Sequence, residues 1–280
     1  MQGKTVVITG ATSGIGEVAA DRLALKGAKI VFVARDRARA EETLKHLNAI
    51  APDGGHAVHY ADLTRLSDMT RVAAEIAAAE PKIDVLVNNA GALFNSRQVT
   101  EDGLEKTFAL NHMSYFVLTN ALLDRLKAGA NARIVSTASD AHKGARLDFD
   151  DLQSQRNYSG FAVYGRSKLM NILFTRELAR RLAGTGVTAN CLHPGFVATR
   201  FGHGSGGFLG PVVKIAQNFA LTPEQGAETI IYLASSPGVE GKSGGYYHKS
   251  KPAVPTKEAQ NDADAKRLWT MSAEVAGLGA

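Results

Sequence analysis

Tyr164 and Lys168 stand four residues apart in the stretch Tyr164-Gly165-Arg166-Ser167-Lys168. On an α-helix this spacing places both side chains on one face, with Cβ atoms about 5–6 Å apart. A phenol has a pKa of about 10 and is a poor acid or base at neutral pH, but a fixed ammonium group nearby stabilises the phenolate and lowers that pKa. The pair could therefore transfer a proton, or it could simply share a solvated helix face.

A second Tyr–Lys pair has the same spacing, at Tyr247 and Lys251. It lies between Gly244-Gly245 and Pro252, which disfavour a helix, so its side chains need not share a face. The first pair is followed by apolar residues at helical spacing. These residues are Leu169, Ile172, Leu173, Leu178 and Leu182. We therefore expect a helix there and regard Tyr164 as the candidate acid or base.

A glycine-rich turn follows the β-branched run Thr5–Thr9 and precedes a predicted helix from Glu17 to Leu25. Strand, turn and helix in this order direct backbone N–H groups and a helix N-terminus toward a pyrophosphate. The spacing is G-x-x-x-G-x-G rather than the commoner G-x-G-x-x-G. The glycines could form only a tight connection, but we favour phosphate binding. The residues assigned to it are Gly10, Thr12, Ser13, Gly14, Ile15 and Gly16.

The second predicted strand, Ala28 to Val33, ends in Ala34-Arg35-Asp36. At this place an acid commonly holds the ribose 2′-OH of NAD, whereas an arginine accommodates the 2′-phosphate of NADP. Asp36 could be the ribose acid, or it could cap the helix predicted over Arg37 to Asn48. We favour the cap, with Arg35 as the phosphate ligand and NADP(H) as the cofactor.

Strands and helices alternate along the rest of the chain. Further strands are predicted at His56–Tyr60, Val85–Val87, Arg133–Thr137, Val187–Leu192 and near Tyr246. Further helices are predicted at Leu66–Glu80, Glu101–Leu126, after Tyr164, from Thr222-Pro223-Glu224-Gln225 to Ala234, and at Asp264–Val275. This alternation predicts an α/β fold over residues 1–280, a single Rossmann-type domain whose doubly wound parallel sheet has helices on both faces.

Composition and charge exclude several classes of protein. The chain has 280 residues, a net charge of +5 and one cysteine, Cys191, which suits a reducing compartment. Its basic residues are spread out, so nucleic-acid binding is not expected. His56 and His59 lack an obvious third ligand, so they indicate strand positions and no metal site is expected. We see no signal peptide and no apolar run near the ~20 residues of a membrane span, and therefore expect a cytoplasmic protein.

Together the motifs resemble the short-chain dehydrogenase/reductase family along essentially the whole chain. The matching features are Thr9-Gly10-x-x-x-Gly14-Ile15-Gly16, Asp62, Asn88-Asn89-Ala90-Gly91, Asn111, Ser139, Tyr164-x-x-x-Lys168 and Pro194-Gly195. Ala141-His142, Lys251-Pro252-Ala253 and Arg267-Leu268-Trp269 are most similar to the retinol-dehydrogenase-like branch. One departure is Thr137, where paired serines would be usual. Membrane-bound relatives carry a hydrophobic leader that we do not find, so a membrane location does not carry over.

The resemblance implies four catalytic roles. Tyr164 would exchange a proton with the substrate oxygen, Lys168 would hold Tyr164 acidic and bind the nicotinamide ribose, and Ser139 would orient the substrate. Asn111, which by itself reads as a buried structural residue, would hold a water that relays protons from Lys168. Further cofactor contacts are implied at Asp62, Leu63, Asn89, Ala90, Gly91, Pro194, Gly195, Val197 and Thr199. The helices bearing Asn111 and Tyr164 would form a homodimer or homotetramer, which the stretch from Ser139 to Tyr164 could obstruct.

We therefore expect an NADP(H)-dependent alcohol dehydrogenase or carbonyl reductase. A sugar-nucleotide epimerase or dehydratase shares the Tyr/Lys pair but generally has T-G-x-x-G-x-x-G and a larger C-terminal domain. An NADP-sensing regulator on the same fold would not need all four catalytic residues.

The region 196–222 combines glycines with apolar residues. The apolar residues are Phe196, Phe201, Phe208, Leu209, Val212, Val213, Ile215 and Phe219. They could complete the core, or they could form a lid that closes over the nicotinamide and excludes water. In the lid interpretation the substrate is a lipophilic ketone, aldehyde or alcohol.

Overall fold

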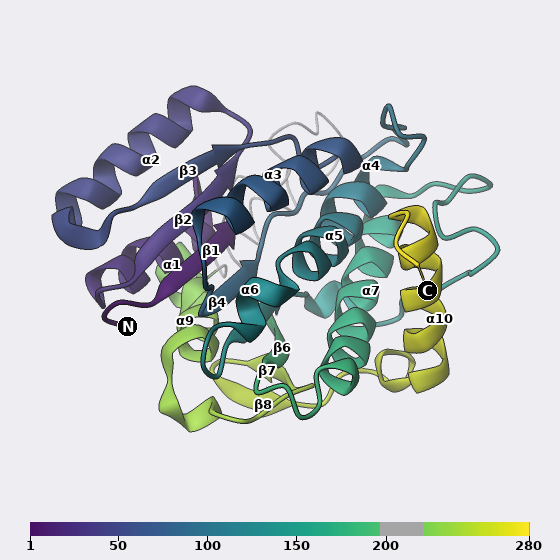
Figure 1. Cartoon of the computed structure of the whole chain (residues 1–280). Coiled ribbons are helices and arrows are strands. Elements are labelled where there is room, and N and C mark those ends of the chain that lie inside the picture. Colours follow the sequence, from purple (N-terminus) through teal and green to yellow (C-terminus); the bar gives the residue numbers. More distant parts are fainter. Residues whose placement is uncertain (197–220, 280) are drawn as a thin grey trace.

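The computed structural model describes residues 1–196 and 221–279. Its eight described strands form one sheet in the order β3-β2-β1-β4-β5-β6-β7-β8, parallel except for β8 (Figure 1). The strands are β1 (Thr5–Thr9), β2 (Lys29–Ala34), β3 (Ala57–Tyr60), β4 (Val85–Asn88), β5 (Arg133–Thr137), β6 (Thr188–His193), β7 (Tyr246–His248) and β8 (Lys251–Ala253). The predicted α/β fold is confirmed. The predicted lid falls almost entirely outside the described residues, as do Val197 and Thr199.

The central strands are buried on both faces because helices cover the sheet on both sides. Val6, Val7 and Ile8 of β1 are at most 1% exposed, as β-branched residues of a central parallel strand should be. The strand order reverses between β1 and β4, which pair at Ile8 and Val87. In open α/β sheets ligands bind at the carboxyl ends of the strands where this reversal occurs. We call this edge of the sheet the carboxyl edge.

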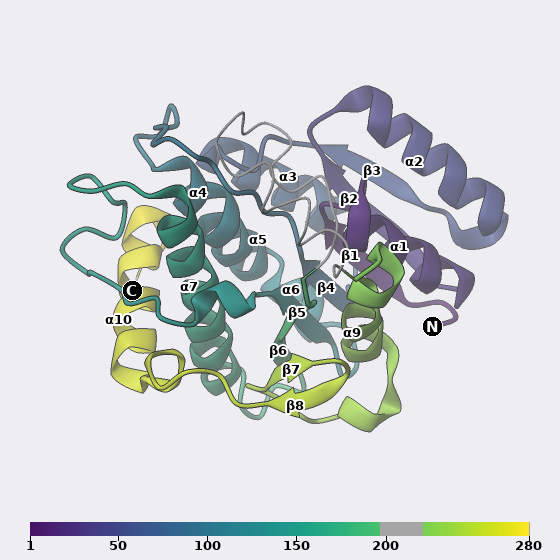
Figure 2. The ribbon, with the colours of Figure 1, turned by 180° about the vertical axis from the view of Figure 1, so that it is seen from behind.

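Two groups of helices cover the sheet. Helices α1 (Gly14–Leu25), α2 (Arg37–Ile50) and α9 (Pro223–Ser235) pack on one face, on which α9 is seen in Figure 2. Helices α3 (Leu66–Ala79), α5 (Ser114–Ala121), α6 (Leu123–Lys127), α7 (Gly160–Arg181) and α10 (Asp262–Val275) belong to the core on the other face (Figure 1). Shorter turns are α4 (Lys106–Phe108), the π-turn Ala109–Met113, and the 3₁₀ turns Pro52–Gly54, Asp140–His142, Pro237–Val239 and Glu258–Gln260. Within the described residues, no helix combines the length and apolar character needed to span a membrane.

Helix α10 packs along α7 on the side away from the sheet (Figure 1). Trp269 of α10 stacks on Phe174 of α7, with ring centres 5.8 Å apart, and meets Phe116 of α5 edge-on at 4.9 Å. The guanidinium carbon of Arg181 lies over the Trp269 ring, 4.3 Å from the ring centre. Part of the surface of the Tyr164 helix, which the resemblance assigns to subunit pairing, is therefore covered within the chain.

The prediction of one continuous helix over Glu101–Leu126 is wrong. Residues 101–105 do not form a helix, so the helical segment begins later than predicted. The Glu105 carboxylate accepts hydrogen bonds from the N–H groups of Thr107 and Phe108, both at 2.8 Å, and so caps its first turn, α4. A π-turn follows, and Leu122, with ψ near 2°, separates α5 from α6. The apolar pattern continues through these breaks because the segment stays buried throughout. The pattern therefore shows burial without showing where the helix is interrupted.

The predicted cap of α2 is confirmed, and α9 begins where it was predicted to begin. Asp36 accepts a hydrogen bond from the Arg39 N–H at 3.1 Å and caps α2. Thr222 and Gln225 form a reciprocal capping box at the start of α9. Tyr247 and Lys251 lie on the neighbouring strands β7 and β8 and not on a helix, as expected. The edge strand β8 itself was not predicted, and its Pro252 is tolerated because an edge strand needs fewer backbone donors.

Candidate active site

The predicted site residues gather along the carboxyl edge. Gly10 follows β1, Asn89 follows β4, Ser139 lies two residues beyond β5, and Pro194 follows β6 directly. The fifth contribution comes from α7, which carries Tyr164 and Lys168. Since the parallel strands all end at this edge, residues distant in the sequence meet there.

The turn after β1 is tightly fastened to the end of β4. The Asn89 side-chain amide donates to the carbonyl oxygens of Thr9 at 3.1 Å and Gly10 at 3.3 Å. The Thr9 hydroxyl oxygen accepts from the N–H groups of Asn89 and Ala90, both at 3.0 Å. Asn89 and Ala90 thus shape the glycine turn from behind, in addition to their predicted place beside the cofactor.

The glycine turn fits a pyrophosphate group. Gly10 and Gly14 have φ of 71° and 60°, values that favour glycine. A Cβ atom on Gly16 would lie 2.1 Å from the Gly10 carbonyl oxygen, so only glycine allows this close approach. Within the described residues the Ser13 side chain does not cap α1. The first-turn N–H groups of α1 can therefore serve an anionic ligand together with Thr12, Ser13 and Ile15.

Arg35 lies just beyond β2 and is mostly exposed, with 70% of its side chain accessible. Its nearest ion-pair partner within the described residues is Asp62, at 4.0 Å between Nη1 and Oδ2. The Asp62 carboxylate is fixed in position because its Oδ1 accepts hydrogen bonds from the Thr64 N–H at 3.0 Å and from the Thr64 hydroxyl at 2.9 Å. Leu63 beside it is buried. Arg35 is thus accessible to a phosphate, while Asp36 is engaged as the cap of α2.

Tyr164 and Lys168 share one face of α7, with the Lys168 Nζ 5.5 Å from the centre of the Tyr164 ring. Lys168 is 2% exposed and donates to the Thr137 carbonyl oxygen at 3.0 Å. Burial lowers the pKa of Lys168 to about 7. At neutral pH its charged and neutral forms are therefore comparably populated.

The expected lowering of the Tyr164 pKa is not found. The Tyr164 ring is partly exposed, yet desolvation of the hydroxyl raises its pKa, and a hydrogen bond with Ser139 only partly opposes this. The physical reason is that desolvation penalises the phenolate and equally disfavours the Lys168 ammonium that was expected to stabilise it. Tyr164 is consequently neutral at physiological pH, the form that can donate a proton.

Ser139 is oriented by its own turn. Its hydroxyl oxygen accepts from the Ala141 N–H at 3.1 Å, which leaves the hydroxyl hydrogen to point toward Tyr164 or a substrate oxygen. Asn111 is fully buried in the π-turn, and its amide exchanges two 2.9 Å hydrogen bonds with the backbone of Ala92. It also donates to the Ser167 hydroxyl at 2.9 Å. The water relay of Asn111 stays a prediction.

Gly91 lies between Asn111 and Lys168. A Cβ atom on Gly91 would stand 3.2 Å from the Asn111 Oδ1 and 3.4 Å from the Lys168 Nζ. Gly195, beyond Pro194, has φ of 92°, and a Cβ there would meet the Leu221 side chain at 2.3 Å. Gly195 is therefore favoured by its positive φ, whereas a side chain at Gly91 would require small shifts of Asn111 and Lys168.

Sequence reasoning missed several polar groups that support the site. Asn171 donates to the same Thr137 carbonyl oxygen as Lys168, at 3.3 Å. His142 and His193 contact the Ser139 turn through their ring nitrogens. A signal was available in the position of Asn171, which lies three residues after Lys168 and therefore on the same face of the helix.

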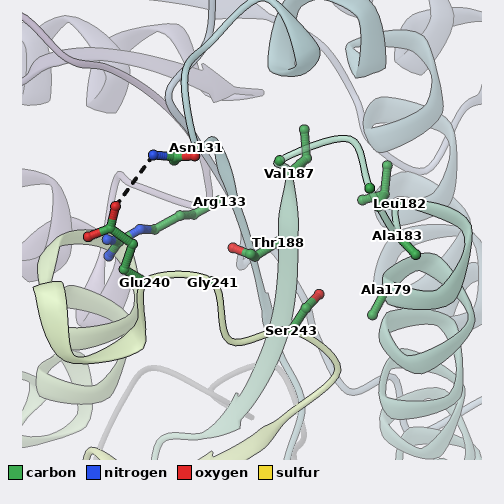
Figure 3. Close-up of a pocket in the computed structure, with 12 residues that line it drawn as sticks. Asn131, Arg133, Ala179, Leu182, Ala183, Val187, Thr188, Glu240, Gly241 and Ser243 are labelled. Carbon is green, nitrogen blue, oxygen red and sulfur yellow. Dashed lines mark hydrogen bonds between the residues drawn. The ribbon is translucent and has the colours of Figure 1, made fainter.

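A separate cavity of about 240 Å³ lies at the opposite edge of the sheet, where β5 and β6 begin (Figure 3). Arg133 lines it, but the guanidinium donates to the carbonyl oxygens of Leu233 and Ser236 at 3.2 and 2.8 Å, near the C-terminal end of α9. Glu240 accepts from Asn131 across the cavity at 3.4 Å. These polar groups stabilise the joint between α9 and β5, so the cavity is distinct from the predicted catalytic residues.

Known proteins share both sequence and fold with this chain. The family described as short chain dehydrogenase matches residues 4–206. Retinol dehydrogenase 14 of Homo sapiens is 43% identical over 296 residues, covering 99% of this chain and 88% of that protein. Retinol dehydrogenase 13 of Homo sapiens is 40% identical over 287 residues, covering 99% and 86%.

Solved structures agree with these sequence matches. The crystal structure of an uncharacterized protein from Mycobacterium Paratuberculosis has a TM-score of 0.81 and 32% identity, covering 99% of this chain and 94% of that chain. The Pseudomonas aeruginosa RhlG/NADP active-site complex has a TM-score of 0.70 and 27% identity, covering 88% and 94%.

Proposed function

Since the chain belongs to the short-chain dehydrogenase/reductase family, in its retinol-dehydrogenase-like branch, we propose that it is an NADP(H)-dependent enzyme that interconverts a lipophilic carbonyl compound and its alcohol. The observation that carries this proposal is the meeting of Tyr164, Lys168 and Ser139 at the carboxyl edge. The relatives reported above are retinol dehydrogenases, so they do not favour an NADP-sensing regulator or a sugar-nucleotide epimerase or dehydratase.

The residues divide the chemistry between them. NADP(H), when bound, supplies or accepts the hydride. Neutral Tyr164 donates its hydroxyl proton to the substrate oxygen during reduction and recovers it in the reverse direction. Ser139, whose oxygen is already engaged by the Ala141 N–H, donates a second hydrogen bond to the same substrate oxygen. Lys168 lies close enough to Tyr164 to stabilise the phenolate as the proton leaves.

Arg35 supports the choice of NADP(H). Its guanidinium is exposed beyond β2, and its ion pair with Asp62 is long, with 4.0 Å between Nη1 and Oδ2. The guanidinium is therefore available to bind a 2′-phosphate. Asp36, the alternative ribose ligand, has its carboxylate engaged in capping α2. The RhlG structure named above is an NADP complex, which is consistent with this choice for a 27% identical relative.

Exposed aromatic residues beside the site support a lipophilic substrate. Phe161, three residues before Tyr164, is 69% exposed, and Phe196, directly after Gly195, is 60% exposed. Large apolar side chains at this exposure can stabilise a bound apolar group by about 25 cal/mol for each Å² removed from water. The names of the relatives above point to retinol, a lipophilic alcohol. The lid over 196–222, of which residues 197–220 lie outside the described structure, and the cytoplasmic location stay predictions.

The first experiment follows NADPH absorbance with aldehydes and ketones of rising chain length. We expect kcat/KM to rise with chain length, and a flat or falling trend would contradict the lipophilic class. Tyr164→Phe should lower turnover by about 10²–10⁴ while NADPH still binds. Tyr247→Phe is the matched control because Tyr247 has the same spacing to a lysine but lies on β7. A Tyr164→Phe variant of near-normal activity would refute the catalytic assignment.

The second experiment tests cofactor choice. The wild-type protein should use NADPH more efficiently than NADH because the Arg35 guanidinium can bind the 2′-phosphate. Ala34→Asp combined with Arg35→Ala should reverse this preference by placing a carboxylate against the ribose. Equal efficiency of the two cofactors with the wild-type protein would show that Arg35 is an ordinary surface residue.

A further inference from the structure

One ring nitrogen joins two separate segments of the site. The Nδ1 of His193 accepts hydrogen bonds from the Asp140 N–H at 3.2 Å and from the Gly195 N–H at 3.4 Å. Asp140 directly follows Ser139, and Gly195 belongs to the segment Pro194–Gly195 to which the resemblance assigns cofactor contacts. The two segments leave the neighbouring parallel strands β5 and β6. Nδ1 of His193 therefore bridges the substrate-orienting turn and the cofactor segment.

The hydrogen bonds also determine the tautomer of His193. Because Nδ1 accepts two N–H groups, its lone pair must be available, and the ring proton must reside on Nε2. Nε2 lies 3.5 Å from the Asp140 Oδ2. The Asp140 carboxylate is itself held by the Tyr246 hydroxyl at 3.1 Å and by the Lys143 ammonium at 2.7 Å. Asp140 thus contacts the ring through both its backbone N–H and its carboxylate.

His142 holds the other side of the same turn. It is fully buried, its Nδ1 lies 2.6 Å from the Ser139 carbonyl oxygen, and its Nε2 accepts from the Thr256 N–H at 3.4 Å. His142 must therefore carry its proton on Nδ1, opposite to His193. The Ser139 turn therefore contacts two neutral histidines. Of these two, only His193 also accepts a hydrogen bond from the cofactor segment.

We propose that His193 is a positioning residue whose unprotonated Nδ1 holds the Ser139 hydroxyl in register with the Pro194–Gly195 segment. This inference rests on the proposed function, since the register concerns the substrate oxygen and the reacting carbon of the cofactor. A shift of either segment separates the two reacting partners, and small misplacements of this kind reduce turnover strongly. The effect should therefore fall on kcat more than on folding.

Charge on His193 would oppose this role. A proton on Nδ1 would face the N–H groups of Asp140 and Gly195 instead of accepting from them. The titratable groups around the ring are Asp140, Lys143, His142 and His248, the last with its ring centre 4.9 Å away. Burial is the largest effect and lowers the pKa of His193, and His248, Lys143 and His142 lower it further. The Asp140 carboxylate raises this pKa but is outweighed, so that the pKa of His193 is about 4. The neutral form therefore prevails over the working range of pH.

The test compares two amides that place their oxygen differently. His193→Asn can put its side-chain oxygen near the position of Nδ1, whereas His193→Gln reaches toward the position of Nε2. We expect His193→Gln to lower kcat at least about tenfold with a smaller change in KM, and His193→Asn to stay within about threefold of the wild type. His248→Gln, which changes the neighbouring ring without touching either N–H group, is the control. Equal losses in both His193 variants, or none, would overturn the proposal.

A second measurement does not depend on turnover. Side-chain ¹⁵N spectra of the wild-type protein at neutral pH, assigned by the signal lost in His193→Asn, should show His193 protonated only on Nε2. A proton on Nδ1, or a charged ring, would overturn the proposal even if no substrate were found. If the tautomer is as expected but no carbonyl compound is reduced with either cofactor, then the proposed function fails and the bridging geometry stands.

Discussion

Replacing Lys168 with methionine should make the protein more stable while removing its activity. Lys168 is 2% exposed, and its pKa falls from 10.5 in the unfolded chain to about 7 in the folded protein. At about 1.4 kcal/mol for each pH unit, this difference corresponds to about 4–5 kcal/mol of stability lost by burying the group at neutral pH. Methionine has a similar shape and no charge. It gives up one hydrogen bond to the Thr137 carbonyl oxygen, at about 1 kcal/mol, and Asn171 still serves that oxygen.

The expected net gain for Lys168→Met is therefore about 3–4 kcal/mol in the free energy of unfolding at pH 7. The sign with pH follows from proton binding. Between pH 7 and 10.5 the unfolded chain holds the Lys168 proton more tightly than the folded protein, so wild-type stability rises with pH through this group. The variant lacks this rise, and its advantage should shrink toward pH 10.5.

Urea denaturation of the free protein at several pH values would measure both effects. Lys266→Met is a suitable control because it removes the same charge from an exposed position of α10. A Lys168→Met variant less stable than the wild type, by an amount that does not change with pH, would refute the reasoning that the ammonium is desolvated.

Three other predictions concern the pKa of Tyr164, the glycine turn and the cover of α7. Because the raised pKa keeps Tyr164 neutral while Lys168 loses its charge above about pH 7, carbonyl reduction should hold its rate below about pH 7 and fall toward pH 9; the rate of reduction against pH checks this, and a rate that stays constant to pH 9 contradicts it. Gly16→Ala should weaken NADPH binding by more than about tenfold in a titration because its Cβ would meet the Gly10 carbonyl oxygen at 2.1 Å. Gly279→Ala, in open space, should bind normally, and equal affinities would disprove the role of the turn. Trp269→Ala should lower the free energy of unfolding by about 3–5 kcal/mol in urea, and a loss below about 1 kcal/mol would show that the aromatic cluster is poorly packed.

Local signals were sufficient to predict most of the fold. Thr5–Thr9 is predictable as a central strand because β-branched residues there are buried from both faces. The start of α9 is predictable because Thr222 and Gln225 satisfy N–H groups within four residues of each other. The interruptions between Glu101 and Leu126 were not predicted in this way. The cap by Glu105 is local, but glutamate is not among the preferred N-cap residues. The π-turn contains Asn111, whose hydrogen bonds reach the distant residues Ala92 and Ser167.

The candidate site was predictable in its residue types but not in its electrostatics. The spacing of Tyr164 and Lys168 on one helix face could be derived from helical geometry. The direction of the Tyr164 pKa could not, because desolvation depends on how closely distant segments enclose the hydroxyl. The same limit applies to His193, whose partners Asp140 and Gly195 come from different strand ends.

The packing of α10 on α7 also bears on the order in which the protein can fold during synthesis. The aromatic cluster joins Phe116 and Phe174 to Trp269, which lies much later in the chain. While the ribosome is still producing the intervening residues, the part of α7 that receives Trp269 has nothing to bury it. Contacts between such distant segments form slowly, because a long loop must close first. We therefore expect the helix that carries Tyr164 and Lys168 to acquire its final packing only after α10 has emerged.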